Sequence, residues 1–427
     1  MFDLPRNVWL LGWVSLATDA ASEAIYPLLP FFLTSVLNAG AVSLGIVEGA
    51  AEAANSLLKI VSGRIADRSP AKRPLVLAGY SLSSAVRPFI AAATGWIQVF
   101  TIRVLDRVGK GVRGAPRDAM LAASATPTTR GKVYGFHQGM DNLGAVVGPA
   151  LATLFLVAYP GRYRLLFALT AIPGAIAVLL ILLIREDNTP VAAPAETIES
   201  DFPSSLRVDE SRTAKLVGGS RTDIGRAGGS ARLPPQFHKF MIVLSLFMLG
   251  NSTDAFLLLK LTEAAGSARF VPLMWAGIHV VKATVSIVGG SWSDRIGRRI
   301  VIAIGWIVYA VVYAGFAFSS GLAALLTWFF IYGFYFGFAE GTEKALVADL
   351  APPTRRGTAF GIYNAVTGLG ALVASVLFGV LWKAFSAAVA FGTGAALAVL
   401  ATALLFLVVP STGARSSRAA DMRLPRL

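Results

Sequence analysis

Cysteine is absent from this chain of 427 residues, which excludes disulfides and thiolate metal sites. There are only three histidines, His137, His238 and His279, and they lie too far apart in the sequence to suggest a metal site. Charged residues are scarce at 15%, whereas hydrophobic residues make up 55% and the mean hydropathy is +0.65. This balance argues against a soluble protein and indicates an integral membrane protein in a lipid bilayer.

The chain also lacks the motifs by which enzymes and nucleic-acid-binding proteins are usually recognised. We find no nucleophile beside a base, no phosphate-binding loop and no metal-spaced histidine cluster. The net charge of +14 has a simpler explanation than nucleic acid, because cytoplasmic loops of membrane proteins collect Lys and Arg. We therefore expect no enzymatic activity, no cofactor, no metal and no nucleic-acid partner.

Twelve apolar segments are long enough to span a bilayer as helices, which takes about 20 residues. They lie near residues 8–34, 44–62, 74–94, 97–124, 133–157, 163–184, 238–262, 270–290, 300–318, 322–350, 358–382 and 385–410. The first segment is long enough to span, so we expect a retained helix and not a cleaved signal. The sequence thus predicts an all-α membrane protein with twelve transmembrane helices.

A polar stretch at 185–237 separates the sixth apolar segment from the seventh. It is rich in Gly, Ser, Pro, Arg and acidic residues and has few large apolar side chains, which is typical of a flexible linker. The predicted domains are therefore an N-terminal six-helix bundle at 1–184, the linker, a C-terminal bundle at 238–410 and a tail at 411–427. We expect the protein to be a monomer.

Loop charge predicts the orientation in the membrane. Basic residues gather in the loops after the second, fourth, eighth and tenth segments: Arg64, Arg68, Lys72, Arg73, Arg130, Lys132, Arg295, Arg298, Arg299, Arg355 and Arg356. The opposite loops hold little beyond Arg162, Arg164, Arg269 and Lys383. The strongly basic side is expected to be cytoplasmic. The protein would then lie in the cell inner membrane, with both termini and the linker on the cytoplasmic side.

The chain repeats itself. The stretch GRIADR from Gly63 recurs as GSWSDR from Gly290, which is 227 positions later. The stretch RGKVYGFHQGMDNLGA from Arg130 recurs as RGTAFGIYNAVTGLGA from Arg356, which is 226 positions later. Two nearly equal offsets predict two related six-helix halves, a plan that many transporters use around a site near the middle of the membrane.

At these residues the chain resembles the major facilitator superfamily. The family's loop motif, Gly-x-x-x-Asp-Arg-x-Gly-Arg-Arg, is matched throughout in the second half from Gly290, through Asp294 and Arg295. The first-half copy has Gly63, Asp67 and Arg68, followed by an altered turn. The resemblance implies that this loop latches the two halves on the inner face during transport.

Two further motifs strengthen the resemblance. Arg103, Gly109 and Gly111 match a motif of the fourth helix whose arginine the family links with proton handling. The fifth helix matches a glycine motif that the family associates with exporters exchanging substrate for protons, through Gly135, Gly144, Gly148 and Pro149. Small residues also let helices pack closely, and we expect this helix to flex at 144–149. The predicted gating residues are Gly63, Asp67, Arg68, Gly144, Gly148, Pro149, Gly290, Asp294 and Arg295.

The fourth segment carries an unusual run of charge, LDRVGKGVRGAPRDAM, from Leu105 to Met120. An ionised residue at a helix centre costs roughly 2.5–3.5 kcal/mol, so these side chains must face water or each other. Candidate partners recur at helical spacing: Asp19, Glu23 and Tyr26 on the first segment, Glu48, Glu52, Asn55 and Lys59 on the second, and His137 and Asp141 on the fifth. We expect an ion-pair network in which Arg87, Glu48 and Arg113 are structural.

Asp19 and Glu23 are the leading candidates for proton uptake and release, because both lie in the middle of a helix that lines the cavity in the resembled family. Arg103 and Arg107 would then bias their protonation. The full predicted proton-coupling set is Asp19, Glu23, Arg103, Asp106, Arg107 and Asp141. The predicted substrate-binding set is Tyr26, Glu52, Lys110, His279, Lys282, Tyr332 and Tyr363. Two roles are equally expected for three further residues, either a direct functional role or support of the inner gate: Lys59, His137 and Asp118.

The function that these observations predict is a proton-coupled secondary transporter working by alternating access, an exporter of a small molecule in exchange for protons. A second reading is a carrier for an anionic or metal-chelate metabolite, held by Arg107, Lys110 and Lys282. A third, from another class, is a transporter-like membrane sensor whose linker carries the signal.

Overall fold

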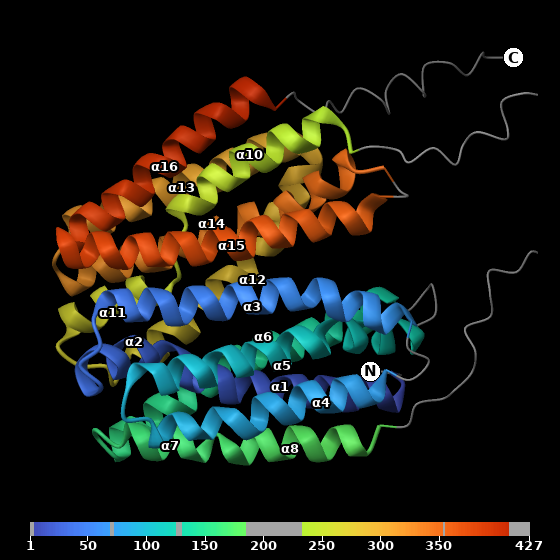
Figure 1. Ribbon diagram of the computed structural model, residues 1–427, viewed down its shortest axis with the longest axis vertical. Coiled ribbons are helices and arrows are strands. Elements are labelled where there is room, and N and C mark those ends of the chain that lie inside the picture. Colours follow the sequence, from blue (N-terminus) through green and yellow to red (C-terminus); the bar gives the residue numbers. More distant parts are fainter. Residues whose placement is uncertain (1–3, 69–71, 125–129, 185–232, 353–354, 410–427) are drawn as a thin grey trace, which may run out of the picture. The chain divides into compact units, whose positions relative to one another are not determined.

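The computed structural model describes residues 4–68, 72–124, 130–184, 233–352 and 355–409, and these are almost entirely helical (Figure 1). The first half contains α1 (Arg6–Ile25), η1 (Tyr26–Leu28), α2 (Leu29–Phe31), η2 (Phe32–Val36), α3 (Ala41–Arg68), α4 (Arg73–Val86), η3 (Arg87–Ala92), α5 (Trp96–Ala123), α6 (Arg130–Ala158), α7 (Tyr163–Leu169) and α8 (Ala171–Leu182). The second half contains α10 (Pro235–Gly250), α11 (Ala255–Ala265), α12 (Val271–Ile296), α13 (Arg298–Phe318), α14 (Leu322–Leu350), α15 (Arg356–Ala384) and α16 (Ala387–Val408). The twelve predicted spans are confirmed.

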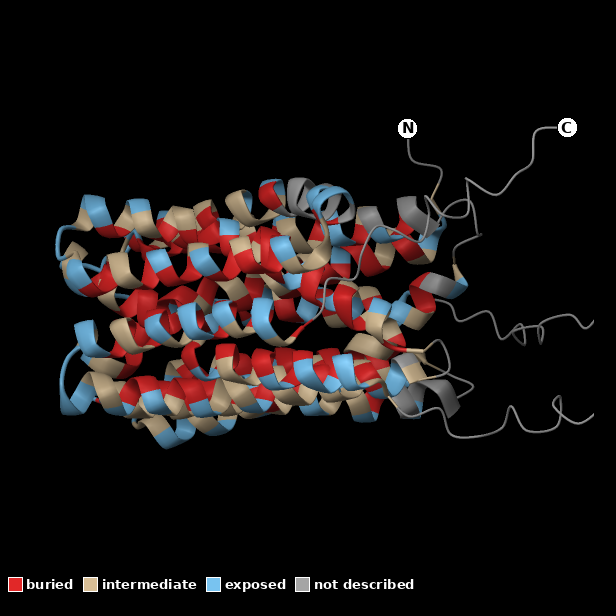
Figure 2. Ribbon diagram, turned by 90° about the horizontal axis from the view of Figure 1, so that it is seen from above, coloured by how far each residue is buried: buried red, intermediate tan, exposed pale blue. Residues whose placement is uncertain are grey.

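Eight of the described spans are long and apolar enough to cross a membrane on composition alone. The helices α1, α3 and α5 are not among these eight, and they carry many of the charged residues discussed above. The part Val271–Val285 of α12 is apolar but shorter than a full span. Exposed residues recur along the outer helices, as the pale blue ribbon of Figure 2 shows. Large apolar side chains are among the exposed residues, including Phe89, Leu154, Leu179, Ile242 and Leu407. Such faces suit lipid, so the charges of α1, α3 and α5 must be accommodated inside.

The seventh span is interrupted, whereas the sequence predicted a continuous helix at 238–262. α10 ends at Gly250 and α11 begins at Ala255. The intervening Asn, Ser, Thr and Asp side chains compete with helical hydrogen bonding. The freed backbone groups find partners, because Tyr309 Oη donates to the Gly250 carbonyl at 2.7 Å and the Thr253 amide donates to Ser375 Oγ at 3.1 Å.

The loops divide the helical bundle into two ends. We call the end that carries Arg73, Arg298 and Arg299 the basic end, and the other the far end. Arg73 Nη2 donates to the Leu182 carbonyl at 2.7 Å, and Arg299 Nη1 donates to the Val409 carbonyl at 2.6 Å. These bonds place the last residues of both halves at the basic end.

The halves pack together chiefly through α3 against α15 and α6 against α12 (Figure 1). At the far end they share one apolar cluster, in which Leu28 and Phe32 of the first half join Phe256 and Phe378 of the second. Two smaller clusters, one around Tyr80 and the other comprising Val285, Val301 and Phe338, each belong to a single half. In the part of the chain that the structure describes, the two halves therefore share a continuous apolar core at the far end.

The predicted gating helix α6 packs tightly on α1. A Cβ atom on Gly148 would lie 2.7 Å from Ala20 Cα, whereas one on Gly139 of the same helix would meet nothing within 4 Å. Gly148→Ala is therefore expected to push the helices apart and lower the free energy of unfolding by about 1–3 kcal/mol. Thermal unfolding in detergent measures this, with Gly139→Ala as the matched control. Equal stability of both variants would contradict the tight packing.

Candidate functional site

A cavity of about 450 Å³ lies between the two halves. This volume is in the range of small-molecule sites in proteins. Its first-half wall contains Glu23, Tyr26, Glu48, Glu52, Asn55, Lys59, Arg107 and Lys110, and its second-half wall contains Asn251, Ser252, Thr253, Asp254, Trp275, Tyr332 and Phe336. Of the predicted substrate-binding residues, Tyr26, Glu52, Lys110 and Tyr332 line the cavity.

Glu23 joins the two halves across the cavity. Trp275 Nε1 of α12 donates to Glu23 Oε2 at 2.7 Å, and His279 Nε2 lies 4.0 Å from the same oxygen. Tyr26, three residues after Glu23, contacts the second half through Thr253 Oγ1 at 3.4 Å and through the Trp275 ring, with centroids 5.0 Å apart. A carboxylate of one half is thus held by a hydrogen-bond donor of the other, the indole N–H of Trp275.

Asp254 is the second-half acid of the cavity, and the sequence prediction missed it. Tyr332 Oη donates to Asp254 Oδ1 at 2.7 Å, and Lys282 Nζ lies 3.5 Å from Oδ2. Lys282 does not line the cavity itself but lies behind it, 3.5 Å from the centre of the Phe336 ring. The signal that would have found this acid is the run Gly-Asn-Ser-Thr-Asp inside an apolar segment.

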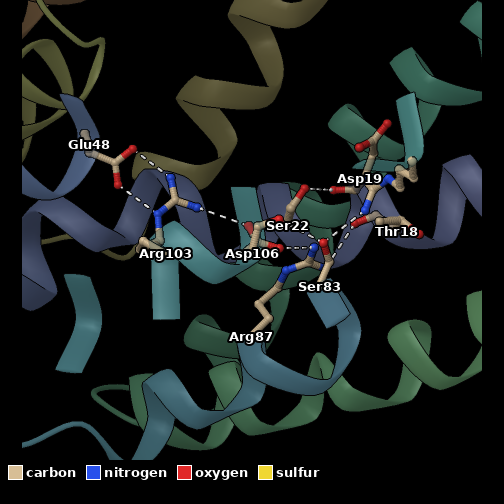
Figure 3. Close-up of polar contacts among 9 residues, drawn as sticks. Thr18, Asp19, Ser22, Glu48, Ser83, Arg87, Arg103 and Asp106 are labelled. Atoms are coloured by element: carbon tan, nitrogen blue, oxygen red, sulfur yellow. Dashed lines mark hydrogen bonds and ion pairs between the residues drawn. The ribbon is translucent and has the colours of Figure 1, made fainter. Parts of the chain in front are cut away.

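The charges of α5 form an ion-pair network beside the cavity (Figure 3). Arg103 binds Glu48 of α3 through two hydrogen bonds of 2.9 and 2.7 Å. Asp106 lies 2.9 Å from Arg87 and 3.6 Å from Arg103. All four side chains are buried, with at most 5% of each exposed. The predicted network is therefore present, and Glu48 and Arg87 have the structural positions that the sequence suggested.

One predicted pairing is wrong. We expected Arg103 to act beside Asp19 and Glu23, but its ion pairs are with Glu48 and Asp106, and it contacts the first helix at the Tyr26 ring, 5.6 Å away. Helical spacing does not determine which turn of a neighbouring helix a side chain of α5 meets.

Arg107 and Lys110 stand apart from this network and face the cavity. Among the described residues neither side chain makes a hydrogen bond or an ion pair, and the same holds for Lys59, an exposed residue of α3 in the cavity wall. The carboxylate of Glu52 accepts a hydrogen bond from Asn55 Nδ2 at 3.2 Å and makes no ion pair in the described structure. The charges available to a ligand are thus mainly positive.

Asp19 and Asp141 lie outside the cavity lining. Asp141 accepts a hydrogen bond from Ser15 Oγ of α1, and His137 Nδ1 lies 3.8 Å from it. Asp19 has no side-chain hydrogen bond or ion pair within the described structure, and it faces Gly144 on α6. Of the two α1 acids that the sequence grouped together, Glu23 lines the cavity and Asp19 does not.

Tyr363 does not line the cavity either. Its hydroxyl donates at 3.2 Å to the buried carboxylate of Glu343, which also accepts a hydrogen bond from Trp306 Nε1 at 2.8 Å. His279 likewise lies behind the wall, next to Glu23 and the Trp275 ring. The prediction that Tyr363 contacts substrate is therefore wrong for the described cavity, because its hydroxyl is engaged inside the second half.

Most of the predicted latch lies outside the described side chains, namely Gly63, Asp67, Arg68, Gly290 and Asp294, as does Gly135 of the glycine motif. Arg295 is described and exposed at the basic end. Next to it, Arg298 lies 3.2 Å from Asp349 and donates to Ser293 Oγ at 2.6 Å. Gly144, Gly148 and Pro149 all lie within α6, which is helical throughout.

A twelve-helix membrane protein whose two related halves enclose a polar cavity of this size belongs to the class of membrane transporters. The profile of the Major Facilitator Superfamily matches residues 10–281 and 240–425. The chain belongs to this family, which confirms the resemblance seen in the motifs, and it is a transporter.

Named relatives agree with this assignment. An uncharacterized MFS-type transporter of Methanocaldococcus jannaschii is 31% identical over 412 residues, which cover 95% of this chain and 96% of the relative. The multidrug resistance protein MdtH of Photorhabdus laumondii is 25% identical, with 81% of this chain and 79% of that protein covered.

Solved structures share the fold. The nucleoside transporter NupG superposes with a TM-score of 0.73 at 13% identity, with 95% of this chain and 100% of that chain covered. A bacterial homolog of the human lysosomal transporter Spinster, in an inward-facing and unoccupied conformation, gives a TM-score of 0.70 at 15% identity, with 94% and 96% covered.

Proposed function

We propose that the protein is a proton-coupled secondary transporter that exports a small molecule in exchange for protons. The observation that carries the proposal is Glu23, a cavity carboxylate of the first half whose partners Trp275 and His279 belong to the second half. Protonation would remove the charge that strengthens the hydrogen bond from Trp275 and so weaken a link between the halves. Loading and releasing a proton at this position would thereby bias the alternation of the cavity between the two sides of the membrane.

Further observations support the proposed direction of transport and orientation in the membrane. The basic end is proposed to be cytoplasmic, in the cell inner membrane, because its loops concentrate Arg and Lys. Contacts in the shared apolar cluster close the far end, which supports a state in which substrate enters from the basic end. The similarity to MdtH and the glycine motif of α6 support export.

The remaining predicted residues receive supporting roles. Asp19 and Asp141, on facing helices outside the cavity, are proposed as a second step on the proton route toward the basic end. Arg103 and Asp106 are proposed to fix α5 against α3 and α4, so that Arg107 and Lys110 face the cavity. The latch motif, including Asp67 and Asp294, remains a proposal for the inner gate.

Proton coupling is tested in proteoliposomes of the wild-type protein that contain a pH-sensitive dye. A library of small molecules is added outside, and each transported compound should move protons in the opposite direction, with faster compound flux under an imposed pH gradient. Transport that ignores the gradient for every transported compound would contradict proton coupling.

Deletion of the linker distinguishes the proposed transporter from the alternative, a membrane sensor that signals through its linker. Deleting residues 189–232 is expected to leave membrane insertion and transport unchanged, because the sequence predicts a tether without a core. Transport by the deletion variant is measured in the same vesicles beside the full chain. Loss of transport with normal insertion would favour a sensor or a carrier regulated through the linker.

A further inference from the structure

The acids of the cavity are already engaged. Glu48 is bound by Arg103 at 2.7 Å, and Asp254 is bound by the Tyr332 hydroxyl at 2.7 Å with Lys282 at 3.5 Å. Glu23 accepts the indole N–H of Trp275 at 2.7 Å. Glu52 has only the amide of Asn55. A cationic ligand would therefore find little more than one free carboxylate, unless it displaced a bond inside the protein.

The cavity's cations are in the opposite situation. Arg107, Lys110 and Lys59 line the cavity and have no hydrogen-bond or ion-pair partner in the part of the chain that the structure describes. A guanidinium has five N–H donors and an ammonium has three, and leaving such donors without an acceptor inside a membrane protein is costly. The three side chains are thus available to an anion.

Two of these cations are arranged to bind one group. Arg107 and Lys110 are three residues apart on α5, so they project from neighbouring turns of the same face. A planar guanidinium and an ammonium side by side suit the oxygens of a carboxylate or a phosphate. Lys59 lies on the adjacent helix α3 and is exposed, which suits attraction of an anion into the cavity.

The facing wall of the cavity is aromatic. Trp275, Tyr332 and Phe336 belong to the second half and line the same cavity as Arg107 and Lys110. Their polar atoms are already bonded, because the Trp275 indole N–H and the Tyr332 hydroxyl both donate to carboxylates of the cavity wall. The rings therefore offer apolar and stacking contact to the body of a ligand.

We infer that the substrate is a small organic anion, with a carboxylate or phosphate bound by Arg107 and Lys110 and an aromatic or other flat apolar body against Trp275 and Phe336. This inference rests on the proposed function, because it takes the central cavity as the transport site.

The experiment compares four ligands with the same aromatic body and different charge: phenylacetate, phenyl phosphate, phenethylamine and 2-phenylethanol. Each is titrated into the detergent-purified full chain up to its solubility limit, and the thermal unfolding midpoint is followed. The two anions should raise the midpoint with concentration, because they bind the native state. The amine and the alcohol should give clearly smaller shifts. Phenylacetate and phenyl phosphate together show whether the carboxylate or the phosphate is preferred.

Charge-neutralised variants locate the binding. Lys110→Gln and Arg107→Gln should each weaken anion binding by tenfold or more, whereas Lys239→Gln, an exposed cation on α10 away from the cavity, should leave it unchanged. A larger shift with phenethylamine than with either anion, no shift with either anion, or unchanged anion binding in both cavity variants would overturn the inference. The ligand series on the wild-type chain decides the matter even if a variant fails to fold.

The binding and transport experiments test the substrate class and the proton coupling independently, so either can fail while the other stands. Anion binding without any coupled proton movement in vesicles would contradict proton coupling and leave the substrate class standing. Proton-coupled transport of phenethylamine, without binding of the anions, would overturn the substrate class and leave proton coupling standing.

Discussion

Asp106→Asn is expected to lower the free energy of unfolding by about 3–5 kcal/mol, the usual cost of removing one partner from a buried ion pair. Asp106 is shared between Arg87 at 2.9 Å and Arg103 at 3.6 Å, and all three side chains are buried. The four-residue network of Arg87, Arg103, Asp106 and Glu48 contains two positive and two negative groups, so the substitution leaves an uncompensated guanidinium.

The matched double variant Arg87→Gln with Asp106→Asn restores neutrality and should recover much of the lost stability, because replacing both partners of a buried pair is often nearly neutral. Thermal and denaturant unfolding in detergent measure both variants beside the wild-type chain. Strictly additive destabilisation in the double variant would contradict the pairing.

Glu23→Gln is expected to abolish proton-driven transport, since the titrating carboxylate at the junction of the halves is gone. Glutamine retains the carbonyl oxygen that accepts the Trp275 N–H, so the variant should fold and still exchange substrate down its own gradient. The measurement compares gradient-driven flux with counterflow in proteoliposomes. The expected result is a flux that no longer responds to a pH gradient, with counterflow retained.

Asp141→Asn provides the matched control for this prediction. This variant also neutralises a carboxylate inside the protein. That carboxylate, however, accepts its hydrogen bond from Ser15 of its own half. We expect partial loss of gradient-driven flux in this variant, and a smaller one than in Glu23→Gln. Full proton-driven flux in Glu23→Gln would move the coupling site to Asp19 or Asp141.

The sequence predicted the fold well because its signals were local or repeated. Twelve apolar runs and two repeated stretches, from Gly63 and from Arg130, were enough for the two halves. It also predicted that charges of α5 form ion pairs with charges on neighbouring helices. It did not predict that Arg103 pairs with Glu48 and not with the first-helix acids, because the axial offset between neighbouring helices depends on close contacts such as that of Gly148 with Ala20.

The second-half wall of the cavity was harder to predict. Asp254 lies at the end of a short helix break that hydropathy alone treats as part of an apolar span. The break is stabilised by Tyr309 and Ser375, which are far from it in sequence. Such partners become visible only once the helices are packed, so the prediction placed Tyr363 in the site and omitted Asp254.

The central claim is that the charge on Glu23 controls how closely the halves approach at the far end. The chain has no cysteine, so Ser35→Cys and Glu263→Cys, two exposed far-end positions in opposite halves, can be spin-labelled without background. Distances between the labels are measured in liposomes at neutral and acidic pH. Acidification should increase the population with a longer distance in the otherwise wild-type chain, and Glu23→Gln should remove this pH response. A pH response of the same size in Glu23→Gln would contradict the claim.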